Sequence, residues 1–223
     1  PEELLRERLG AARLKNLRRQ RRRLAEHGEV AFRIVRSPAE VATAVEIFLH
    51  VEASGWKGRR GTALASDAGD TAFIRRATAA LAAHGACEIA TLHAGGLAVA
   101  AGIVPRHLGR AFFFKLGIDE RFAKYSPGMQ LTLDITRHLC ADPAIAGADA
   151  TTGADHPMIG PLWRDREPFG DVLLPLRGPR DPTVALIAAA IGARERLRAA
   201  AHRLRKRAER RYPAAPLISA ETC

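Results

Sequence analysis

The chain has 223 residues, of which 47% are hydrophobic and 26% are charged, and its formal net charge is +11. This length and composition are typical of one large globular domain with a sizeable buried core. The longest apolar run, about residues 183–193, is shorter than the roughly 20 residues that a membrane-spanning helix needs. No secretory signal is visible, so we expect a cytoplasmic protein without a transmembrane segment. Because the first residue is Pro rather than Met, further sequence is expected upstream.

Metal and disulfide chemistry are not expected. The chain has three widely spaced cysteines, Cys87, Cys140 and Cys223. They are too few and too scattered for a disulfide framework or a zinc site. The eight histidines show no paired ligand spacing either. We therefore expect a reducing environment and no bound metal.

The positive charge is concentrated near the two ends of the chain. Residues 1–24 hold nine Lys or Arg and three Glu, and residues 192–211 hold nine Lys or Arg and two Glu. These segments have net charges of +6 and +7, which leaves −2 for the rest of the chain. The basic character thus belongs to two terminal segments and not to the body between them.

The first part of the chain is expected to contain three helices and one strand. Apolar spacing places them, in chain order, at 2–27 (helix), 30–36 (strand), 38–53 (helix) and 71–84 (helix). Gly28 follows the first helix, Ser37 precedes the second, and Asp70 is the expected cap of the third.

Three consecutive strands come next, and helices and strands then alternate. The expected elements are strands at 88–93, 97–104 and 111–118, a helix from 127 to about 140, a strand at 148–152, a helix at 157–163, a strand at 171–176 and a helix at 182–211. Gly95-Gly96 is a strong hairpin signal between two apolar runs. The order β-α-α-β-β-β-α-β-α-β predicts an α/β fold but not a dinucleotide-binding order. Neither GxGxxG nor GxxxxGK[ST] occurs.

The stretch Ser126-Pro127-Gly128 at the start of the 127–140 helix points to an anion site. Ser126 is a favourable N-cap, Pro127 suits the first helical position, and Gly128 allows close approach of backbone or ligand. The first turn of a helix has unpaired N–H groups at the positive end of the helix dipole. A strand leading into such a turn is one way to hold the phosphates of a cofactor.

Four stretches resemble the GCN5-related N-acetyltransferase (GNAT) superfamily, and within it the CelD-like branch. The first stretch begins with LKNLRR at residue 14 and ends at residue 28. The others are ASGWKG at 53–58 with GTAL at 61–64, KLGIDE at 115–120 with YSPG at 125–128, and Trp163. This branch is associated with cellulose or polysaccharide biosynthesis and is related to the FemAB peptidyltransferases. The resemblance implies a mixed, mostly antiparallel sheet flanked by helices, with a basic helix added at each terminus. It also implies a division into a linking helix at 1–28, an acyltransferase domain at 29–178 and a C-terminal helix and tail at 179–223.

The resemblance further implies a donor site for acetyl-CoA or another acyl-CoA. The pantetheine arm would bond to the backbone of the fourth strand, and the pyrophosphate would meet the following turn. The implied residues are Phe113, Phe114, Leu116, Ser126, Gly128, Met129 and Gln130. Most GNAT enzymes have Q/R-x-x-G-x-G/A here, whereas this chain has Tyr-Ser-Pro-Gly-Met-Gln. Relatives of the FemAB type use aminoacyl-tRNA as the donor, and relatives in the CelD-like branch contain two GNAT-like halves. A second half or a homodimer is therefore a possible partner.

The expected reaction moves an acyl group to an amine or hydroxyl of a small-molecule or glycan acceptor. A base that accepts the proton contributes roughly 10²–10⁴-fold to such a rate. Asp119 is the first candidate for this base or for orienting the amine, Glu52 is the second, and Glu120 lies beside Asp119 past the strand end. The alternative is that Asp119 and Glu120 are ordinary turn acids that pair with Lys115 and Arg121.

Lys115 interrupts an otherwise apolar strand. Strand alternation places it opposite Phe114 and Leu116 and level with Phe113. A lysine among buried aromatic side chains needs a partner or a cavity, which favours a site. The alternative is a lysine on an edge strand whose ammonium group reaches solvent.

Two tryptophans are candidates for the acceptor side. Trp56 and Lys57 follow the second helix, where GNAT folds often build that side, although Trp56 would also serve as a core residue. Trp163 would frame the mouth of the site or pack at a helix end.

Two other classes of function remain open. The arginine-rich terminal helices are consistent with binding to tRNA or another polyanion, or with a helix on a membrane surface. Their arginines alternate with Leu and Ala, which favours a solvated or interdomain face, and the region offers only Tyr212 for base stacking. A catalytically inactive GNAT-like half with an interaction role is the other alternative.

Overall fold

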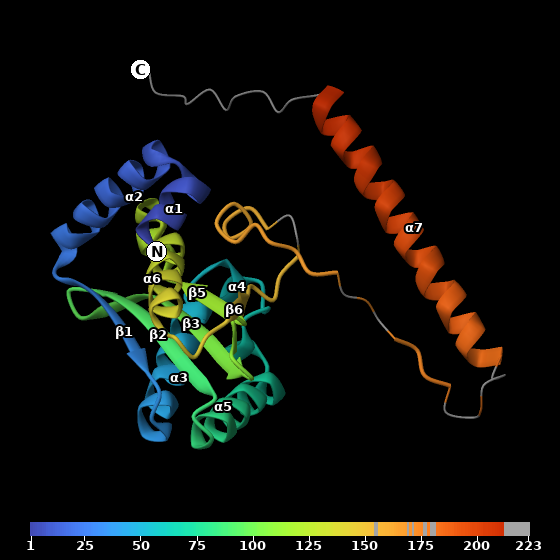
Figure 1. Ribbon diagram of the computed structural model, residues 1–223, viewed down its shortest axis with the longest axis horizontal. Helices are drawn as coiled ribbons and strands as arrows, with labels where there is room; N and C mark the ends of the chain where they lie inside the picture. Colours follow the sequence, from blue (N-terminus) through green and yellow to red (C-terminus); the bar gives the residue numbers. More distant parts are fainter. Residues whose placement is uncertain (154–155, 169, 171, 176–177, 179–181, 212–223) are drawn as a thin grey trace. The chain divides into compact units, whose positions relative to one another are not determined.

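The computed structural model describes residues 1–153, 156–168, 170, 172–175, 178 and 182–211 (Figure 1). The chain divides into two compact units, Pro1–Arg166 and Glu167–Cys223. The first unit contains the six-stranded sheet and also the helices of the basic segment at 1–28.

Helices and strands of the first unit follow the expected order closely. The helices are α1 (Glu2–Leu9), α2 (Ala11–Leu24), α3 (Pro38–Ala53), α4 (Trp56–Arg59), α5 (Ala68–Ala83) and α6 (Pro127–Ala141), with 3-10 turns η1 (Ala25–His27), η2 (Leu64–Ser66) and η3 (Glu120–Tyr125). The strands are β1 (Val30–Val35), β2 (Cys87–Ala94), β3 (Leu97–His107), β4 (Arg110–Phe112), β5 (Lys115–Ile118) and β6 (Gly147–Asp149). The Gly95-Gly96 turn joins β2 and β3 as an antiparallel hairpin, as predicted.

All six strands form one mixed sheet of order β1-β2-β3-β4-β6, and β5 pairs with β3 beside this path. Neighbouring strands are antiparallel except β4 and β6, which are parallel. This architecture confirms the predicted α/β fold with an open, mostly antiparallel sheet flanked by helices.

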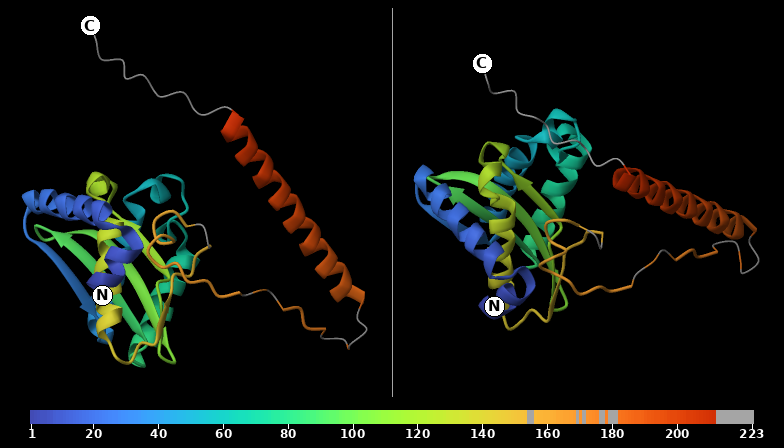
Figure 2. Two further views of the ribbon diagram at one scale, coloured as in Figure 1. Left: turned by 45° about the horizontal axis from the view of Figure 1, so that its top comes forward. Right: turned by 90° about the horizontal axis from the view of Figure 1, so that it is seen from above.

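The sheet separates two layers of helices (Figure 2). Period-2 alternation along β3 sends Ala101 and Ile103 into a buried cluster with α3 and α5, and sends Ala100 and Val104 into a cluster with α6. A third cluster joins α1 and α2 to the outer side of α6 through Leu5, Leu14, Leu17, Met129, Leu133 and Leu162. The hydrophobic stripe of the N-terminal basic segment therefore packs on the domain itself.

Several element boundaries differ from the sequence-based expectation for local physical reasons. The predicted 2–27 helix breaks at Gly10, whose φ of 76° lies in the left-handed region. The third helix begins three residues early because Asp67, not Asp70, caps it, with Asp67 Oδ1 accepting from Asp70 N at 2.9 Å. The segment 157–163 forms hydrogen-bonded turns and not the predicted helix.

The expected strand at 111–118 is divided into β4 and β5 by Phe113 and Phe114, which have no strand assignment. Part of the last predicted strand, Asp171 and Leu176, lies outside the described residues, and 172–175 are not in a strand.

A buried charge network ties the sheet to α6. Glu88 is 1% exposed and contacts Arg36 at 2.7 Å, His138 Nε2 at 2.9 Å, and Arg106. A buried carboxylate is tolerated only where opposite charges and hydrogen bonds compensate its desolvation. This network thus holds β1, β2, β3 and α6 together.

Glu88→Gln is expected to lower the free energy of unfolding by about 3–5 kcal/mol, because removing one partner leaves the facing cations uncompensated. Urea-induced unfolding at neutral pH measures this loss. The control is Glu46→Gln, which breaks the exposed ion pair between Glu46 and Arg75 (2.6 Å) and should cost far less. Equal losses in the two variants would contradict the assigned role of Glu88.

The second unit contains helix α7 (Pro182–Arg211), at the predicted position. Leu186, Leu197 and Leu204 are exposed on it. Asp181, which precedes α7, and the tail from Pro213 lie outside the described residues. No helix in the described part of the chain is long and apolar enough to cross a membrane.

Candidate active site

The sheet opens on one side of β5. Strand β6 runs parallel to β4 only from Arg110↔Gly147 to Phe112↔Asp149. Past this pairing, Phe113 N donates to Asp149 O at 2.7 Å, and Thr151 Oγ1 donates to Phe113 O at 2.9 Å and to Phe114 O at 3.4 Å. Beyond them, β5 has β3 on one edge and no strand of the described chain on the other. The backbone of β5 therefore has no strand partner along that edge within the described residues.

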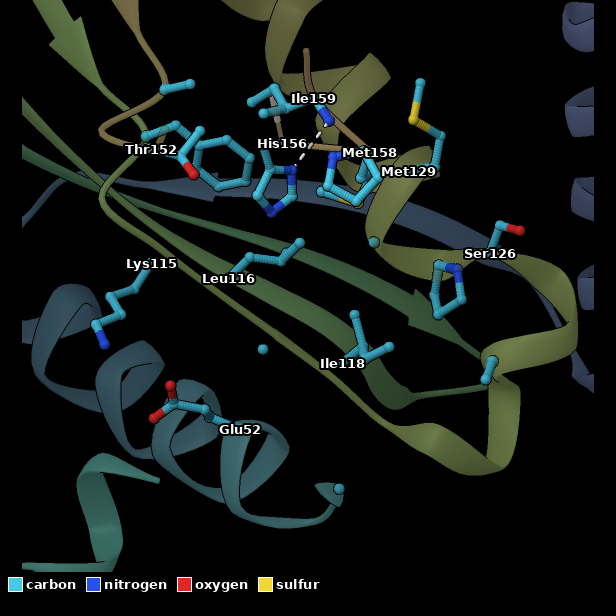
Figure 3. A pocket seen from close by; sticks show the side chains of 18 of the residues that line it. Glu52, Lys115, Leu116, Ile118, Ser126, Met129, Thr152, His156, Met158 and Ile159 are labelled. Atoms are coloured by element: carbon cyan, nitrogen blue, oxygen red, sulfur yellow. Dashed lines mark hydrogen bonds between the residues drawn. The ribbon is translucent and has the colours of Figure 1, made fainter. Parts of the chain in front are cut away.

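A cavity of about 730 Å³ lies against this edge (Figure 3). One part of its wall is formed by the irregular residues Phe113 and Phe114 together with β5. The rest comes from the end of α3, the start of α4, the first turn of α6, one face of α2, and the segments 150–152 and 156–159. These elements are far apart in sequence, so only the fold brings them around one space.

The two faces of β5 have different neighbours. Leu116 and Ile118 lie under the first turn of α6, where an added Cβ on Gly128 would be 3.1 Å and 3.0 Å from their side chains. On the other face an added Cβ on Gly117 would be 2.9 Å from the backbone nitrogen of Glu52. The absent side chains at these two glycines let α6 and α3 approach the strand closely.

The start of α6 has no side-chain cap. Ser126 has φ 52° and ψ 50°, a left-handed conformation, and its hydroxyl makes no capping bond. The predicted N-cap role of Ser126 is therefore wrong, because such a cap needs an extended backbone. Pro127 does begin the helix, as predicted. The first-turn amides are left without a capping side chain beside the cavity, at the positive end of the helix dipole.

A buried carboxylate faces the cavity from the last turn of α3. Glu52 is 3% exposed; its Oε1 is 2.8 Å from Lys57 Nζ, and its Oε2 accepts from Leu64 N at 3.0 Å. Lys57 Nζ also donates to Leu116 O on β5 at 3.3 Å. This ion pair therefore connects the α3–α4 corner to the free edge of β5.

The family model for the acetyltransferase (GNAT) domain matches residues 11–156, which is well over half of the chain. The chain belongs to the GNAT acetyltransferase family. No curated protein matches it. The match supports an acyltransferase, and assignment to the CelD-like branch stays a prediction.

Most of the predicted site residues line the cavity of the GNAT domain. They are Glu52, Trp56, Lys57, Phe113, Phe114, Lys115, Leu116, Glu120, Ser126, Gly128 and Met129. Trp56 is 48% exposed, so it does not serve as a core residue. The structure thus brings together residues from α3, α4, β5 and α6 that the sequence could only name separately.

Asp119 lies outside the cavity lining. It is 4% exposed, and Arg121 binds its carboxylate at 2.6 Å and 3.1 Å. The hydrogen bond from the Arg121 side chain lowers the pKa of Asp119 below its usual value. Asp119 therefore makes the ion pair of the turn-acid alternative, and its lowered pKa makes it a weaker proton acceptor than an unpaired aspartate.

Glu120 lines the cavity, and its carboxylate is also held by an arginine. Its carboxylate accepts from Arg59 at 2.6 Å and from Trp56 N at 2.7 Å. The hydrogen bond from Arg59 and then that from Trp56 lower the pKa of Glu120. Glu120 thus holds the α4 corner in place, and its partner is Arg59 and not Lys115.

Gln130 and Trp163 also lie outside the lining. The Gln130 side chain is buried and donates to Tyr125 O at 2.7 Å. Trp163 donates from Nε1 to Thr136 Oγ1 at 3.0 Å, and its ring centroid is 6.3 Å from that of Phe113. Both side chains therefore make contacts outside the cavity lining, and the predicted roles of Gln130 and Trp163 at the site stay predictions.

Lys115 lines the cavity, but not on the face of Phe113. Phe113 belongs to the core cluster on the α6 side, whereas Lys115 pairs with Ile103, which faces α3. The irregular residues Phe113 and Phe114 shift the alternation by one, which is how a bulge re-aims side chains. Within the described residues, the side chain of Lys115 has no hydrogen bond or ion pair, so its ammonium group is available to a ligand.

Sequence reasoning missed two parts of the lining. One is the α2 face with Arg13, Asn16, Leu17 and Gln20, and the other is the segment with Thr151, Thr152, His156 and Met158. The α2 residues have helical spacing that places them on one face. That spacing was visible, but nothing local shows which face of a helix meets a cavity. In addition, no group of three or more His, Cys, Asp or Glu suited to a metal occurs among the described residues.

Proposed function

We propose that the protein transfers an acyl group from acetyl-CoA or another acyl-CoA to an amine or hydroxyl acceptor. The observation that carries the proposal is the unpaired edge of β5 leading to the uncapped start of α6, within one cavity. An extended pantetheine arm has amide groups that suit a free strand edge. The pyrophosphate suits the first turn of a helix.

The donor and acceptor would meet near the start of β5. The backbone of Leu116 and Ile118 would bind the pantetheine arm, and the amides of Gly128 and Met129 would bind the pyrophosphate. This places the thioester toward Lys115 and the bulge, where Glu52, Trp56 and Lys57 line the cavity. We propose this end as the acceptor side.

Glu52 is the proposed proton acceptor. The acceptor nitrogen or oxygen forms a bond to the thioester carbon, its proton passes to Glu52, and the carbon–sulfur bond then breaks. The CoA thiolate leaves and takes up a proton. Among the candidate carboxylates, Glu52 both lines the cavity and is buried, whereas Asp119 is held by Arg121 outside it. A glycan acceptor in cell-envelope or polysaccharide metabolism is proposed on the resemblance alone.

Calorimetric titration with acetyl-CoA and longer acyl-CoAs tests the donor assignment. We expect saturable binding with a dissociation constant on the order of 1 µM to 1 mM, as is common for enzyme substrates. Titration with tRNA at physiological salt is the parallel measurement. Absence of binding to every CoA would overturn the proposal, and tRNA binding alone would favour an aminoacyl-tRNA donor. Binding of neither would favour an inactive half with an interaction role.

A further inference from the structure

The polar face of α2 borders the same cavity as the start of α6. Arg13, Asn16 and Gln20 line the cavity together with Ser126, Gly128 and Met129. The α2 residues are spaced by three and four positions, so one side of the helix presents all of them.

The position of α2 against α6 is fixed by several contacts. Leu14 and Leu17 pack in the cluster that contains Met129. Arg21 contacts Asp134 at 2.7 Å, and Gln20 Nε2 donates to Lys124 O at 3.3 Å, two residues before Ser126. Apolar and polar contacts together hold the α2 face beside the first turn of α6.

One charged group on this face has no side-chain partner within the described residues. The guanidinium of Arg13 makes neither a hydrogen bond nor an ion pair there, although Arg13 lines the cavity. A guanidinium that borders the same cavity as a helix start suits a phosphate, which it can bind through two N–H groups.

We propose that α2 forms the second wall of the donor phosphate site and that Arg13 binds a phosphate of acyl-CoA. The inference rests on the proposed function, since it assigns the occupant of the same cavity. The α6 amides hold one side of the phosphate groups, and the α2 face holds the other.

Arg13→Ala is expected to weaken acetyl-CoA binding by about 10- to 100-fold, the effect of losing one charge-assisted contact. Calorimetry at 0.15 M salt measures it, because surface charges more than a Debye length away are then largely screened. Arg13→Lys keeps the charge and should retain most of the affinity. Acetyl-dephospho-CoA, which lacks the 3′-phosphate, shows which phosphate Arg13 binds. If Arg13 binds the 3′-phosphate, Arg13→Ala should not weaken the binding of this ligand. If Arg13 binds the pyrophosphate, the loss of affinity should persist.

Arg22→Ala is the matched control. Arg22 is exposed on the same helix, nine residues away and therefore on the opposite face. This variant makes the same change in net charge and should alter affinity by less than about twofold. The inference on Arg13 would be overturned if Arg13→Ala left the affinity for acetyl-CoA unchanged, or if Arg22→Ala lowered it equally. In either case, binding of acetyl-CoA to the wild-type protein would still uphold the donor assignment. If the wild-type protein binds no CoA, the proposed function fails and the inference fails with it.

Discussion

Glu52→Gln is expected to reduce the rate of acyl transfer by about 10²–10⁴-fold, the usual contribution of a positioned base. The amide keeps the size of the side chain but cannot accept the proton, and its NH₂ group would face a second donor, either Lys57 Nζ or Leu64 N, so thermal unfolding must first show that the variant is folded. Steady-state kinetics with saturating donor and acceptor measure the rate. Acetyl-CoA affinity by calorimetry should stay within about threefold of wild type, because the lost group acts on the acceptor.

Asp119→Asn is the matched control for this experiment. It makes the same chemical change in a neighbouring buried carboxylate that pairs with Arg121 outside the cavity lining. We expect the rate with this variant to fall by less than about tenfold. A large loss in Asp119→Asn together with an active Glu52→Gln would return the role of base to Asp119.

Gly128→Asp is expected to weaken acetyl-CoA binding by about 100- to 1,000-fold. The new carboxylate would stand at the first turn of α6, where the pyrophosphate is proposed to bind. Two like charges about 4 Å apart cost roughly 4 kcal/mol at the dielectric of a protein surface. Calorimetric titration of the purified variant measures the loss, after thermal unfolding has shown that the variant is folded.

Gly128→Ala separates the charge from the added bulk. Its Cβ would lie 3.0 Å from Ile118 and 3.1 Å from Leu116, and both of these neighbours are side-chain ends. The better helix propensity of alanine offsets part of that crowding. We expect an affinity loss below about tenfold, and normal affinity in Gly128→Asp would mean that the phosphates bind elsewhere.

The elements of the sheet could be read from the sequence because their signals are local. Alternation marks Val30–Val35, the glycine pair marks the β2–β3 turn, and Ser37 caps α3 with a bond from Glu40 N. Ser126 shows the limit of such signals. Its residue type favours a cap, but its left-handed backbone prevents one.

The composition of the cavity depended on contacts between distant segments. Asp119 and Glu52 are both carboxylates near apolar elements, and no local pattern ranks them. Arg121 binds the first outside the cavity, and the crossing of α3 over Gly117 places the second inside it. The irregularity at Phe113 likewise moved Lys115 to the opposite face, a shift that strand alternation alone could not reveal.

The sequence by itself determined the order of the elements, the hydrophobic faces of the helices and the resemblance to GNAT enzymes. Backbone preferences and the period of apolar residues set these features over a few residues. Only the tertiary structure decided that one edge of β5 has no strand partner, that α2 borders the site, and that Glu52 faces the cavity. Those features follow from the packing of segments that lie as much as a hundred residues or more apart, and the side-chain pattern within one segment carries no record of that packing.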